Sequence, residues 1–177
     1  TLIDTKGTAN NHRYLIKVAK KLIDDQKDAT EIENVLTSLI EQSATLIMTP
    51  NLTHLKKGGR ITPAVAMLGN LLKIVPVMKL NYELGGKIDS LDKVRTVKKA
   101  NLRIIEHMVD ECKVNNHDYI FAIEHVLAEE LAQTMKQVLI DKIGECQIVV
   151  RELPSVAGAH MGVGGIGYQY IRKYEGV

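Results

Sequence analysis

Apolar residues near the start of the chain recur every three or four positions, which is the spacing of an amphipathic helix. The first series consists of Leu15, Val18, Ala19, Leu22 and Ile23, and the second of Ile32, Val35, Leu36, Leu39 and Ile40. Asp28 or Thr30, which lie between the two series, can cap the second helix because short polar side chains accept backbone N–H groups at helix N-termini. The pattern therefore predicts two adjacent helices before any strand.

Further along, short apolar runs typical of buried strands alternate with helical patterns. The expected strands cover residues 45–50, 74–82, 119–124, 147–153 and 166–171, and the expected helices cover 62–73, 96–113 and 127–143. Pro76 has no backbone N–H group, so it predicts an edge or a bulge in the second strand. Because the helices and strands do not alternate strictly, we expect an α/β or α+β fold in a single domain over residues 1–177. It would consist of a mixed, largely antiparallel sheet with helices packed on it.

The composition excludes several function classes. The net charge of the 177 residues is only +2, which is too small to predict a nucleic-acid or membrane surface. Aromatic residues make up 4% of the chain, so we do not expect stacking platforms for single-stranded nucleic acid. The chain has no signal peptide and no apolar run long enough to span a bilayer, which predicts a cytoplasmic protein. Cys112 and Cys146 are interpreted as buried thiols in a reducing compartment.

The stretch AHMGVGGIGYQYIRK, residues 159–173, formally contains the nucleotide-binding pattern G-x-G-x-x-G between Gly162 and Gly167. A dinucleotide site needs a helix after the loop and an acidic residue about twenty positions further on. Only ten residues follow Gly167 and they have the pattern of a strand, so we reject this interpretation. The glycines permit positive φ and can bring N–H groups close to an anion. The alternative is a tight connection between two strands.

Two groups of side chains are candidates for ligand chemistry. His160 lies between small residues and the glycine loop, and an imidazole can donate a hydrogen bond to a carboxylate or phosphate. Lys56, Lys57 and Arg60 surround a glycine turn, which suits phosphate or an acidic protein surface, or equally a solvated helix end. We expect no metal site, because no metal-ligand spacing is found among the other histidines, which are His12, His54, His107, His117 and His125.

Four motifs in a fixed order resemble a known family. They are LKKGGRI (55–61), GNLLKIVPVMKL (69–80), GKIDSLDKVRT (86–96) and AGAHMGVGGIG (157–167). The set resembles the C-terminal part of the DegV family, the fatty-acid-binding FakB proteins, and the resemblance extends from IDTKG (3–7) over nearly the whole chain. It implies a protein of two α/β domains that holds one long-chain fatty acid, with the carboxylate at the domain interface. The acyl tail would lie in the C-terminal domain, and we expect the N-terminal domain to be absent from this chain.

The resemblance also implies that binding and catalysis are carried out by different proteins. The chain would be a lipid-binding protein and not an enzyme, with no cofactor. A separate fatty acid kinase of the FakA type would convert the bound acid to acyl-phosphate for phospholipid synthesis. His160 matches the family's carboxylate-contacting histidine, on a loop shaped by Gly162, Gly164 and Gly165. Arg60 lies in the basic loop associated with kinase docking, together with Lys56 and Lys57.

The family's loop usually has the sequence His-Thr-Gly-Pro-Gly. Here Met161 and Val163 replace the threonine and the proline, so the hydroxyl group and the fixed φ are both lost. This departure concerns the details of head-group contact.

The acyl tail would supply most of the affinity, because burying one methylene contributes about 0.8 kcal/mol. The candidates for the tail pocket are Met67, Leu68, Leu71, Leu72, Ile74 and Val77. Each is also compatible with an ordinary place in the core. The alternative function is a small phosphotransferase or hydrolase that uses His160 and the glycine loop directly and turns over its substrate without a partner.

Overall fold

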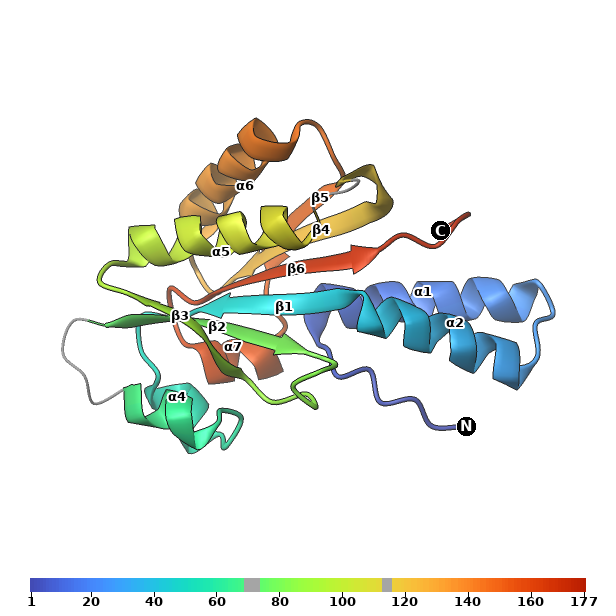
Figure 1. Cartoon of the computed structure of the whole chain (residues 1–177), viewed down its shortest axis with the longest axis horizontal. Coiled ribbons are helices and arrows are strands. Elements are labelled where there is room, and N and C mark those ends of the chain that lie inside the picture. The colour runs from blue at the N-terminus through green and yellow to red at the C-terminus, as the bar shows by residue number, and fades with distance from the viewer. Residues whose placement is uncertain (69–73, 113–115) are drawn as a thin grey trace.

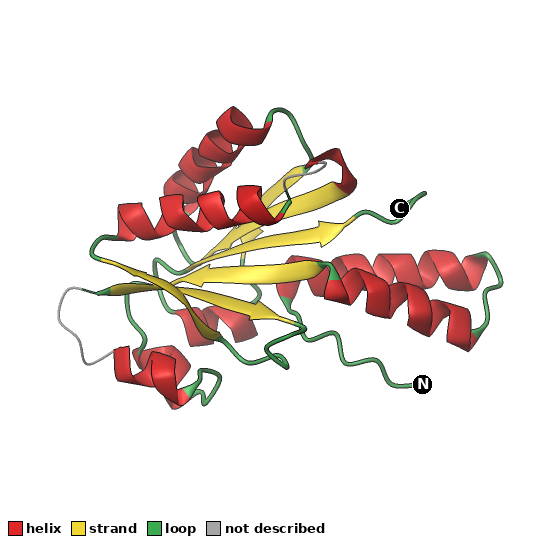
Figure 2. Ribbon diagram, viewed as in Figure 1, coloured by secondary structure: helices red, strands yellow, loops and turns green. Residues whose placement is uncertain are grey.

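A six-stranded sheet forms the centre of the computed structural model, which describes residues 1–68, 74–112 and 116–177. The strand order is β3-β2-β1-β6-β4-β5, and helices cover both faces (Figures 1 and 2). Four of the five neighbouring pairs are antiparallel and the β4–β5 pair is parallel. The predicted fold, a mixed and largely antiparallel sheet with helices packed on it, is confirmed.

The bounds of the elements agree with most of the predicted ones. The strands are β1 (Ser43–Met48), β2 (Val75–Asn81), β3 (Asp89–Val94), β4 (Tyr119–His125), β5 (Ile148–Glu152) and β6 (Ile166–Arg172). The helices are α1 (Ala9–Asp24), α2 (Ala29–Glu41), α3 (Thr53–Lys57), α4 (Pro63–Leu68), α5 (Val97–Glu111), α6 (Glu129–Ile143) and α7 (Ser155–Met161), with a 3₁₀ turn at Asn116–Asp118. The helix expected over 62–73 begins as α4, and residues 69–73 lie outside the described part of the chain.

Local sequence signals explain several element ends. Asp28 caps α2, and together with Glu31 it forms a capping box in which each side chain accepts the other residue's N–H. The sequence predicted an edge or a bulge at Pro76. The strand β2 is paired on both sides, and Pro76 lies next to a register shift between Val77 and Met78 in the β2–β3 pair, so the structure favours the bulge.

Side chains alternate along each strand and so supply two different faces. On one face, Leu46 of β1 and Ile123 of β4 belong to the largest core, which also contains the inward residues of α5 and α6. On the other face the core is divided. Ile120 and Ile171 pack with α1 and α2, while Ile47 packs with residues of α3, α4 and α7. Figure 1 shows α5 and α6 on one side of the sheet and α1, α2, α4 and α7 on the other.

Candidate functional site

A cavity of about 190 Å³ lies on the face of the sheet whose core is divided. Its floor is formed by alternate residues of the central strands, including Thr45 and Ile47 of β1 and Gly167 and Gln169 of β6. Gly167 adds depth, because a Cβ built there has only the Glu124 carbonyl oxygen near it, at 3.9 Å.

Most of the cavity wall is aliphatic. The contributing side chains are Ile47, Leu55, Leu80, Ile88, Leu153 and Met161. They come from four different strands or turns and from α3 and α7, and most of them belong to one of the two smaller cores. Such a wall provides no hydrogen-bond partners, so it is suited to an apolar ligand group.

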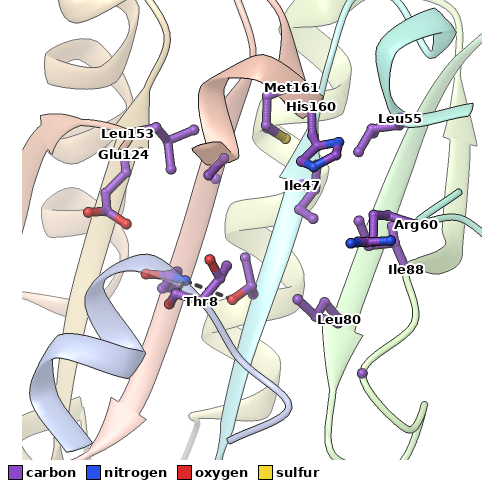
Figure 3. Close-up of a pocket in the computed structure, with 15 residues that line it drawn as sticks. Thr8, Ile47, Leu55, Arg60, Leu80, Ile88, Glu124, Leu153, His160 and Met161 are labelled. Atoms are coloured by element: carbon purple, nitrogen blue, oxygen red, sulfur yellow. Dashed lines mark hydrogen bonds between the residues drawn. The ribbon is translucent and has the colours of Figure 1, made fainter. Parts of the chain in front are cut away.

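An imidazole and a guanidinium reach the same cavity from segments that are distant in sequence. His160 comes from the last turn of α7, and Arg60 follows the turn that ends α3. In Figure 3 the His160 ring lies above Ile47, and the Arg60 guanidinium lies beside Ile88. Together they place one imidazole and one permanent positive charge on an otherwise apolar wall, an arrangement that can bind a carboxylate or phosphate.

A hydrogen-bonded polar group closes another side of the cavity. Gln169 accepts the backbone N–H of Asn10 at 2.8 Å and donates to the Thr8 carbonyl and the Thr45 hydroxyl at 2.9 and 2.8 Å. These bonds satisfy N–H groups at the start of α1 that the helix itself cannot pair. The polar groups on this wall of the cavity are therefore already hydrogen-bonded to one another within the protein.

Glu124 completes this polar wall as a fully buried carboxylate. It accepts from the Arg13 guanidinium at 2.7 Å and from the Asn10 N–H at 3.1 Å, and the Arg151 guanidinium lies 3.8 Å away. The negative charge at the N-terminus of α1 also interacts favourably with the helix dipole. Glu124 thus ties α1 to the sheet, and its charge is compensated before any ligand binds.

The three glycine amides of the loop after α7 are hydrogen-bonded within the protein. The N–H groups of Gly162, Gly164 and Gly165 donate to the carbonyls of Gly158, Val126 and Gly162, at 2.8, 2.9 and 3.1 Å. Gly162 and Gly164 have φ of 72° and 80°, which favours glycine. The loop joins α7 to β6 rather than two strands. Of the residues predicted to bind the carboxylate, only His160 lines the cavity.

The described candidates for the tail pocket do not line this cavity. Met67 is 71% exposed on α4, and Leu68 is buried in the core beneath that helix. Val77 belongs to the core on the opposite face of the sheet, because its neighbour Met78 occupies the cavity side. Ile74 is half-buried. Leu71 and Leu72 lie outside the described residues, so their role stays a prediction.

The predicted basic cluster separates into two parts. All three residues are exposed, but only Arg60 also lines the cavity, whereas Lys56 and Lys57 lie on α3 away from its lining. The aliphatic residues that do line the cavity were missed by the sequence interpretation. A partial signal was present in β1 and β6, where Thr45, Gly167 and Gln169 place polar or small residues on the same face as Ile47.

Two kinds of feature are missing from the part of the chain that the structure describes. Residues 1–68, 74–112 and 116–177 contain no group of three or more His, Cys, Asp or Glu side chains placed to hold a metal ion. No helix within the same ranges has the length and apolar character needed to cross a membrane.

Comparison with known sequences identifies the family. The family model described as "Uncharacterised protein, DegV family" matches residues 1–173. The chain belongs to the DegV family. A DegV domain-containing protein of Streptococcus pneumoniae is 36% identical over 148 residues, which cover 84% of this chain and 51% of the relative. Another, from Clostridium perfringens, is 31% identical over 172 residues, which cover 97% of this chain and 59% of the relative. The chain therefore spans just over half the length of these DegV relatives.

Solved structures agree with this assignment. The fatty acid binding DegV family protein from Streptococcus agalactiae matches with a TM-score of 0.88 at 31% identity, covering 98% of this chain and 60% of that one. DegV, a fatty acid binding protein from Bacillus subtilis, matches with a TM-score of 0.82 at 26% identity, covering 97% and 60%. These matches confirm the resemblance to the DegV family and the predicted mixed sheet with helices packed on it.

Proposed function

We propose that this chain binds a long-chain fatty acid, with the acyl tail against the aliphatic wall and the carboxylate beside His160 and Arg60. The observation that carries the proposal is one cavity that joins an apolar wall to an imidazole and a guanidinium. The DegV relative from S. agalactiae, at 31% identity, is itself a fatty acid binding protein, which supports the same ligand class here.

The energetics of such a ligand match the two parts of the cavity. Each methylene that the aliphatic wall removes from water contributes about 0.8 kcal/mol. A carboxylate that enters a partly apolar site must be compensated by charge and hydrogen bonds, which Arg60 and His160 can supply. The cavity volume of about 190 Å³ lies below the roughly 300–1,000 Å³ of sites for drug-sized ligands. We therefore expect either that the cavity widens when a long-chain fatty acid binds or that part of the tail lies outside it.

We further propose that the bound acid is presented to a separate fatty acid kinase, which forms the acyl-phosphate used in phospholipid synthesis. The chain would then supply binding and no catalysis, and it would act in the cytoplasm. Lys56 and Lys57 are exposed on α3, close in sequence to Arg60 at the cavity. This position supports a role of α3 in contacting an acidic surface of the kinase. The proposal rests on the family resemblance.

The proposal is tested by titrating the 177-residue chain with palmitate and, separately, with 1-hexadecanol, which has the same tail and no carboxylate. We expect palmitate to bind more tightly than the alcohol, and His160→Ala to remove most of that difference. A chain that binds neither ligand, or binds both equally, contradicts the proposal.

The kinase step has its own test. With ATP and a fatty acid kinase, acyl-phosphate should form only when the loaded chain is present. Turnover of a phosphate donor or an ester by the chain alone would instead support the phosphotransferase or hydrolase alternative.

A further inference from the structure

The short helices α3 and α7 contact each other through two reciprocal glycine–histidine pairs. Gly58 ends α3 and Gly162 ends α7. A Cβ built on Gly162 would lie 3.0 Å from Cδ2 of His54 on α3. A Cβ built on Gly58 would lie 2.4 Å from Nδ1 and 2.7 Å from Cε1 of His160 on α7. Because neither glycine has a side chain, the imidazole from the other helix occupies the space beside it.

The two glycines differ in why a side chain is excluded. Gly162 has φ of 72°, so its backbone alone favours glycine. Gly58 has φ of −73° and ψ of −9°, which is an ordinary helical conformation open to any residue. The missing side chain at position 58 is therefore not required by the backbone. It is required only by the place that the His160 ring occupies.

The backbone of Gly58 also binds Arg60, whose guanidinium lines the cavity. Its carbonyl accepts a hydrogen bond from Nη1 of Arg60 at 3.2 Å. Its own N–H donates to the carbonyl of His54 at 3.0 Å, which fixes the peptide within the last turn of α3. One residue outside the cavity lining thus touches both side chains that we place beside the carboxylate.

We propose that Gly58 is a positioning residue for the carboxylate site. Its bare Cα sets where the His160 imidazole lies, and its carbonyl directs the Arg60 guanidinium. The inference deepens the proposed function and rests on it for the identity of the ligand. The proposal also explains why position 58 of LKKGGRI is a glycine. The end of α3 does not explain it, because any residue can adopt the φ of Gly58.

The substitution Gly58→Ala separates positioning from folding. An added methyl at 58 must displace the His160 ring, and this ring is the free end of a side chain that can rotate away at small cost. We expect a folded protein with unchanged binding of 1-hexadecanol and roughly tenfold weaker binding of palmitate, the scale of one lost hydrogen bond to a charged group. The control is Gly59→Ala in the same turn, where an added Cβ meets nothing within 4 Å among the described residues. Gly59 has φ of 63°, which favours glycine, so this variant should lose some stability without displacing the His160 ring. It should leave the ratio of palmitate to hexadecanol affinity unchanged.

A double-mutant cycle gives the decisive comparison. In a His160→Ala background the ring is absent, so adding Gly58→Ala should change palmitate affinity by less than twofold. Equal losses in the two backgrounds, or equal losses for palmitate and hexadecanol, would overturn the proposal. If Gly58→Ala fails to fold, the double variant must fold, since it removes the clash. A double variant that also fails to fold overturns the proposal.

A measurement without ligand keeps this inference separate from the proposed function. The ring nitrogens of His160 are followed by ¹H–¹⁵N NMR in the ligand-free wild type and in Gly58→Ala. We expect the His160 ring signals to shift in Gly58→Ala and to stay in place in Gly59→Ala. Unchanged His160 signals in Gly58→Ala overturn the positioning role whether or not the chain binds palmitate. Absence of palmitate binding in the wild type contradicts the proposed function alone.

Discussion

The two faces of the sheet are covered in different ways. On one face, α5 and α6 place fully buried aliphatic residues such as Ile104 and Leu139 against a continuous core. On the other face, α1 and α2 form one core and α3, α4 and α7 form another. The cavity, with Thr45, Glu124 and Gln169 on its polar side, lies on this divided face.

The same strands serve both faces, since neighbouring residues point in opposite directions. Leu46 and Tyr168 fill the continuous core, whereas Ile47 and Gly167 form the cavity floor. One face of the sheet therefore packs as a continuous core, whereas the other carries two smaller cores and leaves room for a cavity. The comparison predicts that substitutions on the two faces change different measured quantities.

The largest expected effect on stability is in the continuous core. Ile104 is 0% exposed, and replacing a buried isoleucine by alanine costs about 3 kcal/mol, since the cavity left behind adds to the lost burial. The matched variant on the other face is Leu153→Ala, on the wall of the existing cavity. It should cost about 1 kcal/mol or less but weaken fatty acid binding. Urea denaturation measures both free energies of unfolding, and equal losses would contradict the comparison.

A second prediction concerns the buried carboxylate on the divided face. Glu124 is 0% exposed, and among the described residues Arg13→Gln leaves the more distant Arg151 as its one charged partner. Uncompensated buried charges cost several kcal/mol, and because Arg13 is 39% exposed we expect a loss of about 2 kcal/mol. The control is Lys20→Gln, which breaks an exposed ion pair with Asp24 and should change stability by under about 0.5 kcal/mol. Similar effects of the two variants would contradict the structural role of Glu124.

The continuous core should also respond to alkaline pH. Burial raises the pKa of the Cys112 thiol from 9.0 to about 12. Above pH 9 the unfolded chain loses this proton while the folded chain keeps it, so stability falls as pH rises from 9 toward 12. In Cys112→Ala the fall should be less steep by about 1.4 kcal/mol per pH unit. Urea denaturation at pH 9, 10 and 11 measures the slopes, and identical slopes would show that the thiol ionises equally in both states.

The smallest expected change in stability is at the C-terminal end of α1, which contributes no residue to the cavity lining. Gln26 has φ of 57°, and the N–H groups of Gln26 and Lys27 donate to Ile23 and Leu22 in the pattern of a Schellman motif. Gln26→Gly should stabilise the protein by about 0.5 kcal/mol, after the entropy of the unfolded chain is counted. Fatty acid affinity should not change. Thermal unfolding tests this against Glu33→Gly, an exposed helix position where glycine should destabilise.

Periodicity predicted the elements that bury one clear face. The helices α1, α2, α5 and α6 and five of the six strands follow from it, because their apolar spacing matches one period. It missed β3, whose sequence DSLDKV is mostly polar and only partly buried, and α7, whose small residues carry little apolar pattern. Both omissions lie at the edge of the sheet or beside the cavity, where burial is incomplete.

The candidate site was predicted in part. His160 was predicted as the carboxylate contact and Arg60 as part of the basic cluster for partner docking, and the structure brings both to one cavity. The expected tail residues were chosen by hydrophobicity, which does not distinguish the two faces of β2: Val77 lies in the continuous core, and Leu80 lines the cavity. Alternation along β2 places Val77 and Leu80 on opposite faces, but the helices packed on the sheet decide which face borders the cavity, and a single sequence does not state this packing.

The central claim is that the cavity on the divided face holds the acyl tail. Gly167→Val tests it most directly, because the added side chain would project into space where the nearest atom to a Cβ is 3.9 Å away, while valine suits a strand. The measurement is denaturing lipid extraction and mass spectrometry of the purified wild-type chain and of Gly167→Val. We predict a fatty acid recovered from the wild type and little or none from the variant, with no loss of stability. Equal amounts of fatty acid from both chains, or none from the wild type when another DegV protein purified in parallel is loaded, would contradict the claim.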